Sequence, residues 1–458
     1  MKKMFFNCLY LLCAFFVFSQ EQIENNVVEI QQEKKYFFPA IAENILSNVA
    51  LSLANRISGE VWTKVDFESI KDNITGGWVW DGDWYITNQF GHPYQGSVYH
   101  AAARASGFNF YEAYMFDAFG SVFWEYFCER NAPSLNDLIS TSLGGASLGE
   151  MFHRLYLEIP NPLAIFVSPM DALNGLVTGR RPVRQSRNIY SFTAAIGAAY
   201  TYAEQAAIQD NGGSMPSGKK SIGKNNIGSI DAASHVVYGD PFEQQSNTPY
   251  NHFELGVYAN IGLPLWYVIK IVSDGYLFSF IAIDKETEKA STGLTLHYDF
   301  FADRHIDFFS EALDWTFKYK KLFLHEAYLE LKLHVGWTIF NANTFHFQEE
   351  YSGLSDTDNN YGTGTNMKFA ITAWNPAWGK FHMDTAVYFV YSVFQNRDND
   401  TGGTLGLFID ASYSHPIGKT ISIGIGASML RETSYYDHLQ NTGKWTNIVR
   451  VFTEWKLK

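Results

Sequence analysis

The chain has 458 residues, a formal net charge of −13 and an aromatic content of 17%. This acidic balance lacks the basic surface on which nucleic-acid binding depends, so we expect no nucleic-acid partner. The mean hydropathy is −0.15, and beyond the N-terminus no uninterrupted apolar run of about 18 residues marks a membrane-spanning helix. The chain is therefore either a soluble β-rich protein or a membrane protein whose apolar residues occupy alternate strand positions.

Residues 1–19 have the form of a secretory signal peptide. Two lysines precede an apolar run over 4–18, and Ser19 supplies a small residue for cleavage. We expect cleavage after Ser19 and export of the remaining chain; a lipoprotein alternative at Cys13 lacks the small residues that normally precede such a cysteine. Cleavage leaves Cys128 as the one cysteine, which excludes an intrachain disulfide framework and a thiolate zinc site.

Residues 20–75 combine a polar N-terminal segment with an amphipathic helix. The stretch 37–57 carries an apolar stripe at helical spacing, made of Ile41, Ile45, Val49 and Leu53. We expect this stripe either to pack on the later helices or to lie at a membrane surface.

Residues 76–182 are predicted to form a helical domain. Helices are expected over 94–106, over 111–130 and from 135 toward 156, the third with Ser134 as its N-cap and an acid three residues later. In the third helix Thr141, Gly145 and Gly149 are spaced by four and share a face. Because glycine costs about 1 kcal/mol against alanine in a helix, this face indicates close approach of a neighbouring helix or wall.

Charged and polar side chains in this domain lie among aromatic residues. An unpaired buried charge is costly, so we predict a polar network that links the helices. Its predicted members are His92, Tyr99, Arg104, Glu125, Glu129, Asp137, Glu150, His153 and Arg154.

Two kinds of chemistry could use such a network. Glu150 and His153 have the spacing of one di-iron ligand pair, but the second such pair is missing from the block, so we predict no metal and no cofactor. A hydrolase would pair Ser97 or Ser134 with His92, His100 or His153, and no nucleophile-elbow motif supports this pairing. The candidate catalytic residues are His100, His153, Glu125 and Glu150, and whether the protein is an enzyme stays open.

Residues 183–458 alternate with period two. Tyr190, Ile196 and Tyr200 belong to an apolar row whose alternate partners are small or polar, as in a lipid-facing strand with aromatic girdles. The same alternation recurs in 253–263, where Phe253 is in the apolar row, and in 328–335, 421–428 and 447–457. Long polar loops and short turns separate about twelve strands, and a soluble sandwich or barrel is the alternative.

Four ordered segments carry a family resemblance. They are NQFGHPYQGSVYHAAAR (88–104), WEYFCE (124–129), PSLNDLISTSLGGASLGEMFHRL (133–155) and SPMDALNGLVTGR (168–180). Together they resemble the DUF3943 family of exported bacterial proteins. The resemblance implies a helical element before an outer-membrane barrel. It implies no catalytic activity, because the family's function is unknown.

We therefore expect a mainly β fold: a transmembrane antiparallel β-barrel of about twelve strands with an N-terminal α-helical domain or plug. The expected location is the bacterial outer membrane, with membrane lipid as partner and a possible solute or lipid ligand in the barrel. The predicted role is a pore, a conduit or an envelope scaffold. The alternative is a membrane-embedded lipid-modifying enzyme that uses histidine and glutamate residues of the helical domain.

Overall fold

A computed structural model gives the fold of this chain. It describes residues 34–159, 162–179, 188–209, 221–243, 245–262, 266–323, 326–344, 359–395, 401–437 and 441–458. The predicted signal peptide (1–19) and the polar segment that follows it up to residue 33 lie outside the described residues.

Twelve antiparallel strands close into a barrel in which each strand pairs with its neighbours in sequence and β1 pairs with β12. The strands are β1 (Ile189–Gln209), β2 (Ser221–Tyr238), β3 (Phe253–Gly262), β4 (Trp266–Asp284), β5 (Glu288–Asp303), β6 (Asp307–Leu322), β7 (Tyr328–Thr344), β8 (Asn359–Asn375), β9 (Gly379–Gln395), β10 (Gly402–Pro416), β11 (Ile421–Tyr436) and β12 (Asn441–Lys456). Closure leaves no strand edge unpaired. The predicted barrel and its strand number are confirmed.

The period-two rows lie on opposite faces of the wall, as the sequence predicts. Ile196 and Ile425 on the outer row are 51% and 60% exposed, whereas inward neighbours such as Thr201 are buried. Tyr190 departs from the expected outer row. A register shift between residues 189 and 191 places its hydroxyl 3.3 Å from Nζ of Lys320, on the opposite wall.

The helical domain precedes the barrel. Its helices are α2 (Phe37–Ile57), α3 (Phe67–Gly76), α4 (His92–Ala105), α5 (Phe110–Phe127), α6 (Leu135–Glu158), α7 (Ala164–Val167) and α8 (Pro169–Thr178), with short turns η2 (Val61–Thr63) and η3 (Thr87–Gly91). Ser134 caps α6 by accepting a hydrogen bond from the Asp137 backbone. Asn109 caps α5 through a capping box with Glu112.

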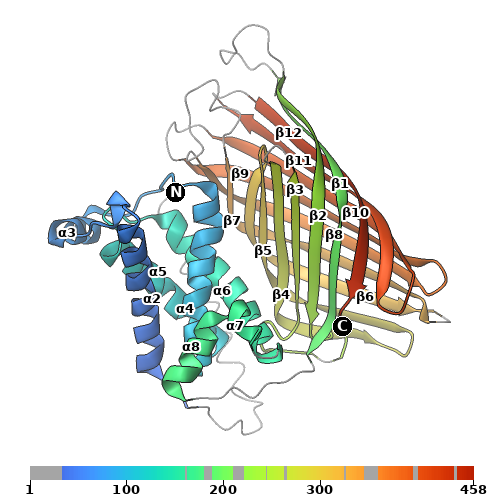
Figure 1. Ribbon diagram of the computed structural model, residues 1–458, viewed down its shortest axis with the longest axis horizontal. Coiled ribbons are helices and arrows are strands. Elements are labelled where there is room, and N and C mark those ends of the chain that lie inside the picture. The colour runs from blue at the N-terminus through green and yellow to red at the C-terminus, as the bar shows by residue number, and fades with distance from the viewer. Residues whose placement is uncertain are drawn as a thin grey trace.

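The helices pack against the outside of the barrel (Figure 1), and the buried cluster that they share with it contains side chains of strands β2 to β8. Val257 belongs to the exposed outer row, is paired with Ile271, and Ile271 is paired with Phe300. Directly paired residues share a face of the sheet, so Phe300 also points out of the barrel. Tyr85 of the helical domain stacks on Phe300 with ring centroids 5.4 Å apart. The helical domain is therefore a lateral platform, and its described helices lie outside the lumen.

One helix of the described residues, α2, is long and apolar enough to cross a membrane by length and composition alone. A core helix of a soluble protein passes the same test, but only 22% of this apolar window is buried. Of the predicted stripe, Val49 and Leu53 are exposed, whereas Ile41 and Ile45 are half-buried and Ile41 packs against a small buried cluster of α2, α4 and α5. The buried positions of α2 are Ala40, Glu43, Asn44 and Asn48.

Candidate functional site

The barrel lumen is organised in layers along the inward row of β6. From the end nearest the β5–β6 turn, this row presents Phe308, Ser310, Ala312, Asp314, Thr316, Lys318 and Lys320. Along this row, away from the β5–β6 turn, the side chains change from aromatic (Phe308) to acidic (Asp314) to basic (Lys318 and Lys320). Each layer recruits side chains from neighbouring and facing strands.

Aromatic rings close the lumen near the β5–β6 turn. Phe301 of β5 stacks on Phe408 of β10 with centroids 4.2 Å apart, and Phe308 of β6 contacts Tyr388 of β9 at 4.9 Å. Strands β5 and β10 lie five places apart in a ring of twelve, so this stacking joins opposite walls. All four rings are buried.

Polar contacts cross the lumen at the same end. The Thr446 hydroxyl of β12 donates to Asp303 of β5 over 2.8 Å. His305, in the β5–β6 turn, lies 3.1 Å from Gln205 of β1 and 2.9 Å from Asn225 of β2. The β5–β6 turn is therefore folded against the far wall, which seals this end together with the aromatic rings.

The second layer holds two histidines and a carboxylate. His297 Nε2 lies 3.2 Å from Asp314 Oδ2, and His334 Nδ1 lies 2.7 Å from the Thr316 hydroxyl. One ligand atom from each of His297, Asp314 and His334 falls within 4.8 Å of the others, a grouping that can hold a metal ion. However, Lys368 Nζ donates to His297 Nδ1 over 2.9 Å, which puts the proton of a neutral imidazole on Nε2, the atom a metal would need.

The third layer is a square of four charges from four strands. Lys318 lies 2.8 Å from Glu254 and 3.2 Å from Asp274. Lys332 lies 2.6 Å from Glu254 and 3.5 Å from Asp274. Two ammonium groups thus balance two carboxylates. This balance is what Lys318 needs, because its side chain is only 1% exposed and a buried charge without a partner is strongly destabilising.

The facing wall is more open. Arg450 of β12 lies 2.8 Å from Asp410 of β10, and His382 lies 3.4 Å from Asp384 on β9. These four residues occupy inward rows, yet the side chain of Asp384 is 46% exposed. A charged recess reached by solvent therefore exists inside the barrel, below the aromatic layer.

In the helical domain, Glu150 of α6 gathers three cations. One oxygen lies 2.6 Å from Arg104 Nε and 3.2 Å from His100 Nε2, and the other accepts from Arg154 Nε over 2.8 Å. His100 Nδ1 lies 2.8 Å from Asp117 of α5. Arg154 also donates to the Pro249 carbonyl over 2.7 Å, which ties this cluster to the link between β2 and β3.

The remaining predicted members lie in separate places. Near the start of α6, His92 lies 3.5 Å from Asp137 and 3.3 Å from Thr141. Glu125 accepts from the Ser134 backbone over 2.8 Å, and Glu129 accepts from the Trp124 indole over 3.2 Å. The Tyr99 hydroxyl bonds to Asn48 of α2, and His153 lies 2.6 Å from Asp171 of α8.

The predicted network is thus several clusters, and it includes acids that sequence reasoning missed. Asp117 completes the Glu150 cluster, and Asp171 orients His153. Asp117 was detectable as a lone acid at the centre of an aromatic helix, and Asp171 as the acid of the quoted SPMD motif. A charged residue inside an apolar segment needs a buried partner, and this argument applies to Asp117 and Asp171 as it does to Glu125 and Glu150.

The histidines are not arranged as bases for a serine nucleophile. Both ring nitrogens of His100 face carboxylates. The Ser97 hydroxyl donates to the Tyr94 carbonyl over 2.6 Å, and the Ser134 hydroxyl donates to Oδ1 of Asn136 over 2.9 Å. A hydroxyl that donates to a carbonyl or amide oxygen is not paired with a base that could activate it.

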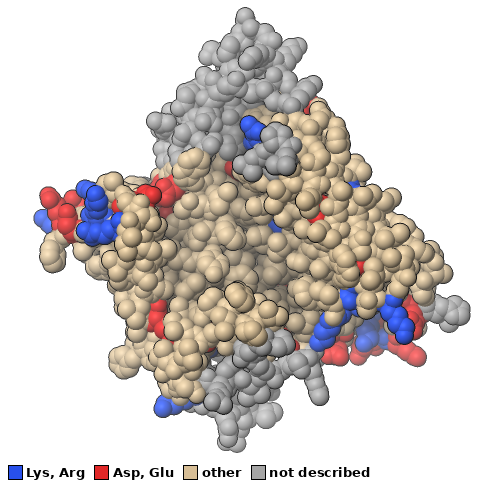
Figure 2. Space-filling model, viewed as in Figure 1, with Lys and Arg blue, Asp and Glu red and all other residues tan. Residues whose placement is uncertain are grey.

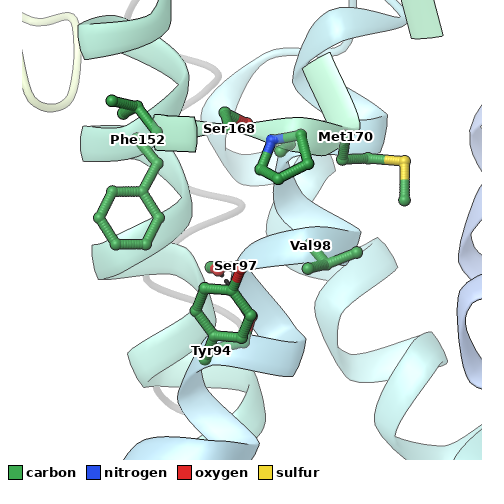
Figure 3. Close-up of a pocket in the computed structure, with 9 residues that line it drawn as sticks. Tyr94, Ser97, Val98, Phe152, Ser168 and Met170 are labelled. Carbon is green, nitrogen blue, oxygen red and sulfur yellow. Dashed lines mark hydrogen bonds between the residues drawn. The ribbon is translucent and has the colours of Figure 1, made fainter. Parts of the chain in front are cut away.

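A small pocket lies between α4, α6 and the α7–α8 junction (Figure 3). Its empty space is about 210 Å³, part of it open to the surroundings. Tyr94, Val98 and Phe152 give it an apolar lining, while Ser97 and Ser168 supply hydroxyls that already donate within the protein. It is better suited to an apolar group than to polar chemistry.

The small residues of α6 lie where α4 crosses. A Cβ built on Gly96 would be 2.0 Å from the Thr141 carbonyl oxygen, and one on Gly149 would be 2.5 Å from Cβ of His100. Side chains cannot occupy these positions, so the glycines set the distance at which His100 and Arg104 reach Glu150.

Residues 77–170 match the family model of DUF3943, described as a domain of unknown function. This DUF3943 region contains α4, α5 and α6 and therefore the whole Glu150 cluster, apart from its tie to Pro249. No curated protein matches the sequence.

Solved structures that resemble the chain include two porins and a transporter. The NanC porin has 9% identity and a TM-score of 0.28, with 57% of this chain and 100% of that chain covered. The KdgM porin has 7% identity, a TM-score of 0.22 and coverage of 57% and 99%. The Ralstonia pickettii toluene transporter TbuX has 7% identity, a TM-score of 0.23 and coverage of 58% and 90%.

Proposed function

We propose that the protein is a gated conduit of the bacterial outer membrane whose passage runs through the barrel lumen. The observation that carries the proposal is the stacking of Phe301 on Phe408 across the lumen, above a charged recess that solvent reaches. A closed barrel with an apolar outer row and a polar interior suits a membrane-spanning conduit. In the present conformation the aromatic layer and the β5–β6 turn close that conduit.

The lining favours a small polar solute that carries charge. The recess presents a guanidinium from Arg450 and carboxylates from Asp384 and Asp410. The opposite wall presents Lys318 and Lys332, each with its ammonium within 3.5 Å of the carboxylates of both Glu254 and Asp274. Rings of both signs of charge tune selectivity in pores, so a zwitterion or a polar solute with separated charges fits better than a hydrocarbon.

Single-channel conductance in planar bilayers tests the proposal. The full-length purified protein is compared with Phe408→Ala, which removes one ring of the closing layer, and with Phe389→Ala. Phe389 is 60% exposed on the outer row of β9, so its loss is a matched control for the loss of an aromatic ring. We expect Phe408→Ala to raise the open-state conductance or the fraction of time open at least several-fold.

Altered migration of unheated protein in electrophoresis verifies that each variant holds a folded barrel. If folded Phe408→Ala and folded Phe301→Ala both conduct no better than the unaltered protein, the lumen is not a gated passage. That outcome would favour the envelope-scaffold alternative, which needs no passage through the lumen.

A further inference from the structure

The exposed surface of the helical domain is apolar between two charged ends. We propose that this domain is embedded in the hydrocarbon layer of the membrane beside the barrel, with lipid acyl chains covering the outer face of α2. The inference rests on the membrane placement of the barrel in the proposed function. It adds that a helical bundle crosses the same layer outside the barrel wall.

The buried face of α2 is mostly polar, apart from Ala40 and the half-buried Ile41, and its exposed face is apolar. Glu43, Asn44 and Asn48 are buried, whereas Phe38 is 80% exposed and Leu46 is 63% exposed. A helix on the surface of a water-soluble domain shows the reverse arrangement. An exposed contiguous apolar face marks a contact with lipid or protein.

The contacts of α2 follow the rules of helix packing in lipid. Asn44 donates to the Phe116 carbonyl over 2.9 Å, and one turn later Asn48 donates to the Gly120 carbonyl over 3.0 Å. A Cβ on Gly120 would lie 2.7 Å from Oδ1 of Asn44. Small residues that permit close approach, with amide side chains bonding between helices, hold helices together where burial from water supplies no driving force.

The dimensions fit a bilayer. The 21 residues of α2 rise about 1.5 Å each, or about 30 Å in all, which equals the usual hydrocarbon thickness. Among the described charged residues of the helical domain, the exposed ones lie at its two ends. They are Lys34 and Lys35 at one end, and Arg56, Glu60, Lys64, Asp66, Glu68, Lys71, Asp72, Asp83 and Arg130 at the other.

The surface view agrees with this division. In Figure 2 charged atoms gather at the α3 end of the helical domain, on the left, and appear again at the lower end of that domain, while the surface between is mostly uncharged apart from one acidic spot. Exposed apolar side chains of α8 continue the apolar face away from α2, namely Leu173, Leu176 and Val177.

The bundle also spans the full height of the barrel wall. At one end Asn188, just before β1, donates to Glu158 of α6 over 2.7 Å. At the other end Asn359, at the start of β8, donates to the Asp83 carbonyl over 2.6 Å. The starts of β1 and β8 lie at opposite ends of an antiparallel barrel. The apolar outer row of the barrel and the apolar face of α2 therefore lie at the same height. The lipid that surrounds the barrel would then also cover the apolar face of α2.

Depth-dependent fluorescence quenching tests the inference. In full-length protein with its three cysteines replaced by serine, Leu46→Cys is labelled with the fluorophore NBD and reconstituted in phosphatidylcholine vesicles. The vesicles contain phosphatidylcholine with a doxyl quencher at carbon 5 or carbon 12 of one acyl chain. Val451→Cys, 57% exposed on the outer row of β12, is the lipid-facing reference, and Lys71→Cys on α3 is the aqueous reference.

We expect quenching at position 46 to match that at position 451 within twofold and to be stronger with carbon 12 than with carbon 5, while position 71 stays unquenched. If position 451 is quenched and position 46 is not, the helical domain lies outside the hydrocarbon layer or is covered by a protein partner, and the inference is wrong. If neither position is quenched, the membrane placement of the barrel itself fails. The two failures are thus distinguished in one experiment.

Discussion

The backbone of Gly145 on α6 lies directly against that of Gly96 on α4: a methyl group on Gly145 would come within 2.7 Å of the Gly96 Cα. This contact fixes the separation of the two helices that supply Glu150 and its partners His100 and Arg104. Backbone atoms cannot move aside as a flexible side chain can, so any substitution at either glycine must separate the helices.

Gly145→Ala is therefore expected to destabilise the protein. Overpacking costs about 1–3 kcal/mol, and contact with backbone atoms at 2.7 Å places Gly145→Ala toward the upper end of that range. Alanine gains roughly 1 kcal/mol over glycine in a helix, which leaves a net loss of up to about 2 kcal/mol. Gly76→Ala is the control, because a Cβ there meets nothing within 4 Å and should leave stability equal or slightly higher. Denaturant unfolding in detergent micelles measures both. Equal stability of the two variants would show that the α4–α6 contact is loose.

Two buried glutamates should respond in opposite ways to the loss of charge. Glu150 contacts three cationic side chains, so Glu150→Gln leaves buried cations without their partner and should cost about 3 kcal/mol. Glu311 projects from the outer row of β6 toward Gly144 of α6, and within the described residues neither of its oxygens is hydrogen-bonded. Glu311→Gln has the same shape without the charge and should hold or raise stability.

The midpoint of denaturant unfolding compares these two variants with the unaltered protein. A loss of stability in Glu311→Gln as large as that in Glu150→Gln would mean that the Glu311 carboxylate has a partner that stabilises it.

The charge of the recess should set the ion preference of the opened conduit. In a Phe408→Ala background, Asp384→Asn removes a partly exposed carboxylate and leaves the lysines and Arg450 in place, so the reversal potential in a salt gradient should shift toward anion selectivity. Glu68→Gln, on α3 and away from the lumen, is the matched control and should not shift it. An unchanged reversal potential in Asp384→Asn would place the ion path elsewhere.

The alternation of apolar and polar residues along the strands predicts the barrel, because successive side chains of a strand between lipid and a polar lumen point alternately to lipid and to the lumen. The rows of β1 and β7 could be assigned from the sequence to the lipid side and the lumen side, apart from Tyr190, which a register shift turns inward. The cap at Ser134 was readable for a similar local reason, since its bond to the Asp137 backbone spans three residues.

The grouping of polar residues was only partly predictable. Arg104, Glu150 and Arg154 were recognised as needing partners. It could not be predicted that Glu150 contacts three cationic side chains while Glu125 accepts a hydrogen bond from a backbone amide. These contacts depend on how α4, α5 and α6 cross.

The antiparallel barrel, the helices before it and the residues on each strand face could be predicted without a structure, because they depend on periodicities read over a few neighbouring residues. Three features became apparent in the folded chain alone: the helices lie outside the barrel, α2 buries Glu43, Asn44 and Asn48, and Phe301 stacks on Phe408 across the lumen. The physical reason is that an apolar stripe has the same appearance whether it faces a protein core or lipid, and that contacts between distant strands exist only once the barrel has closed.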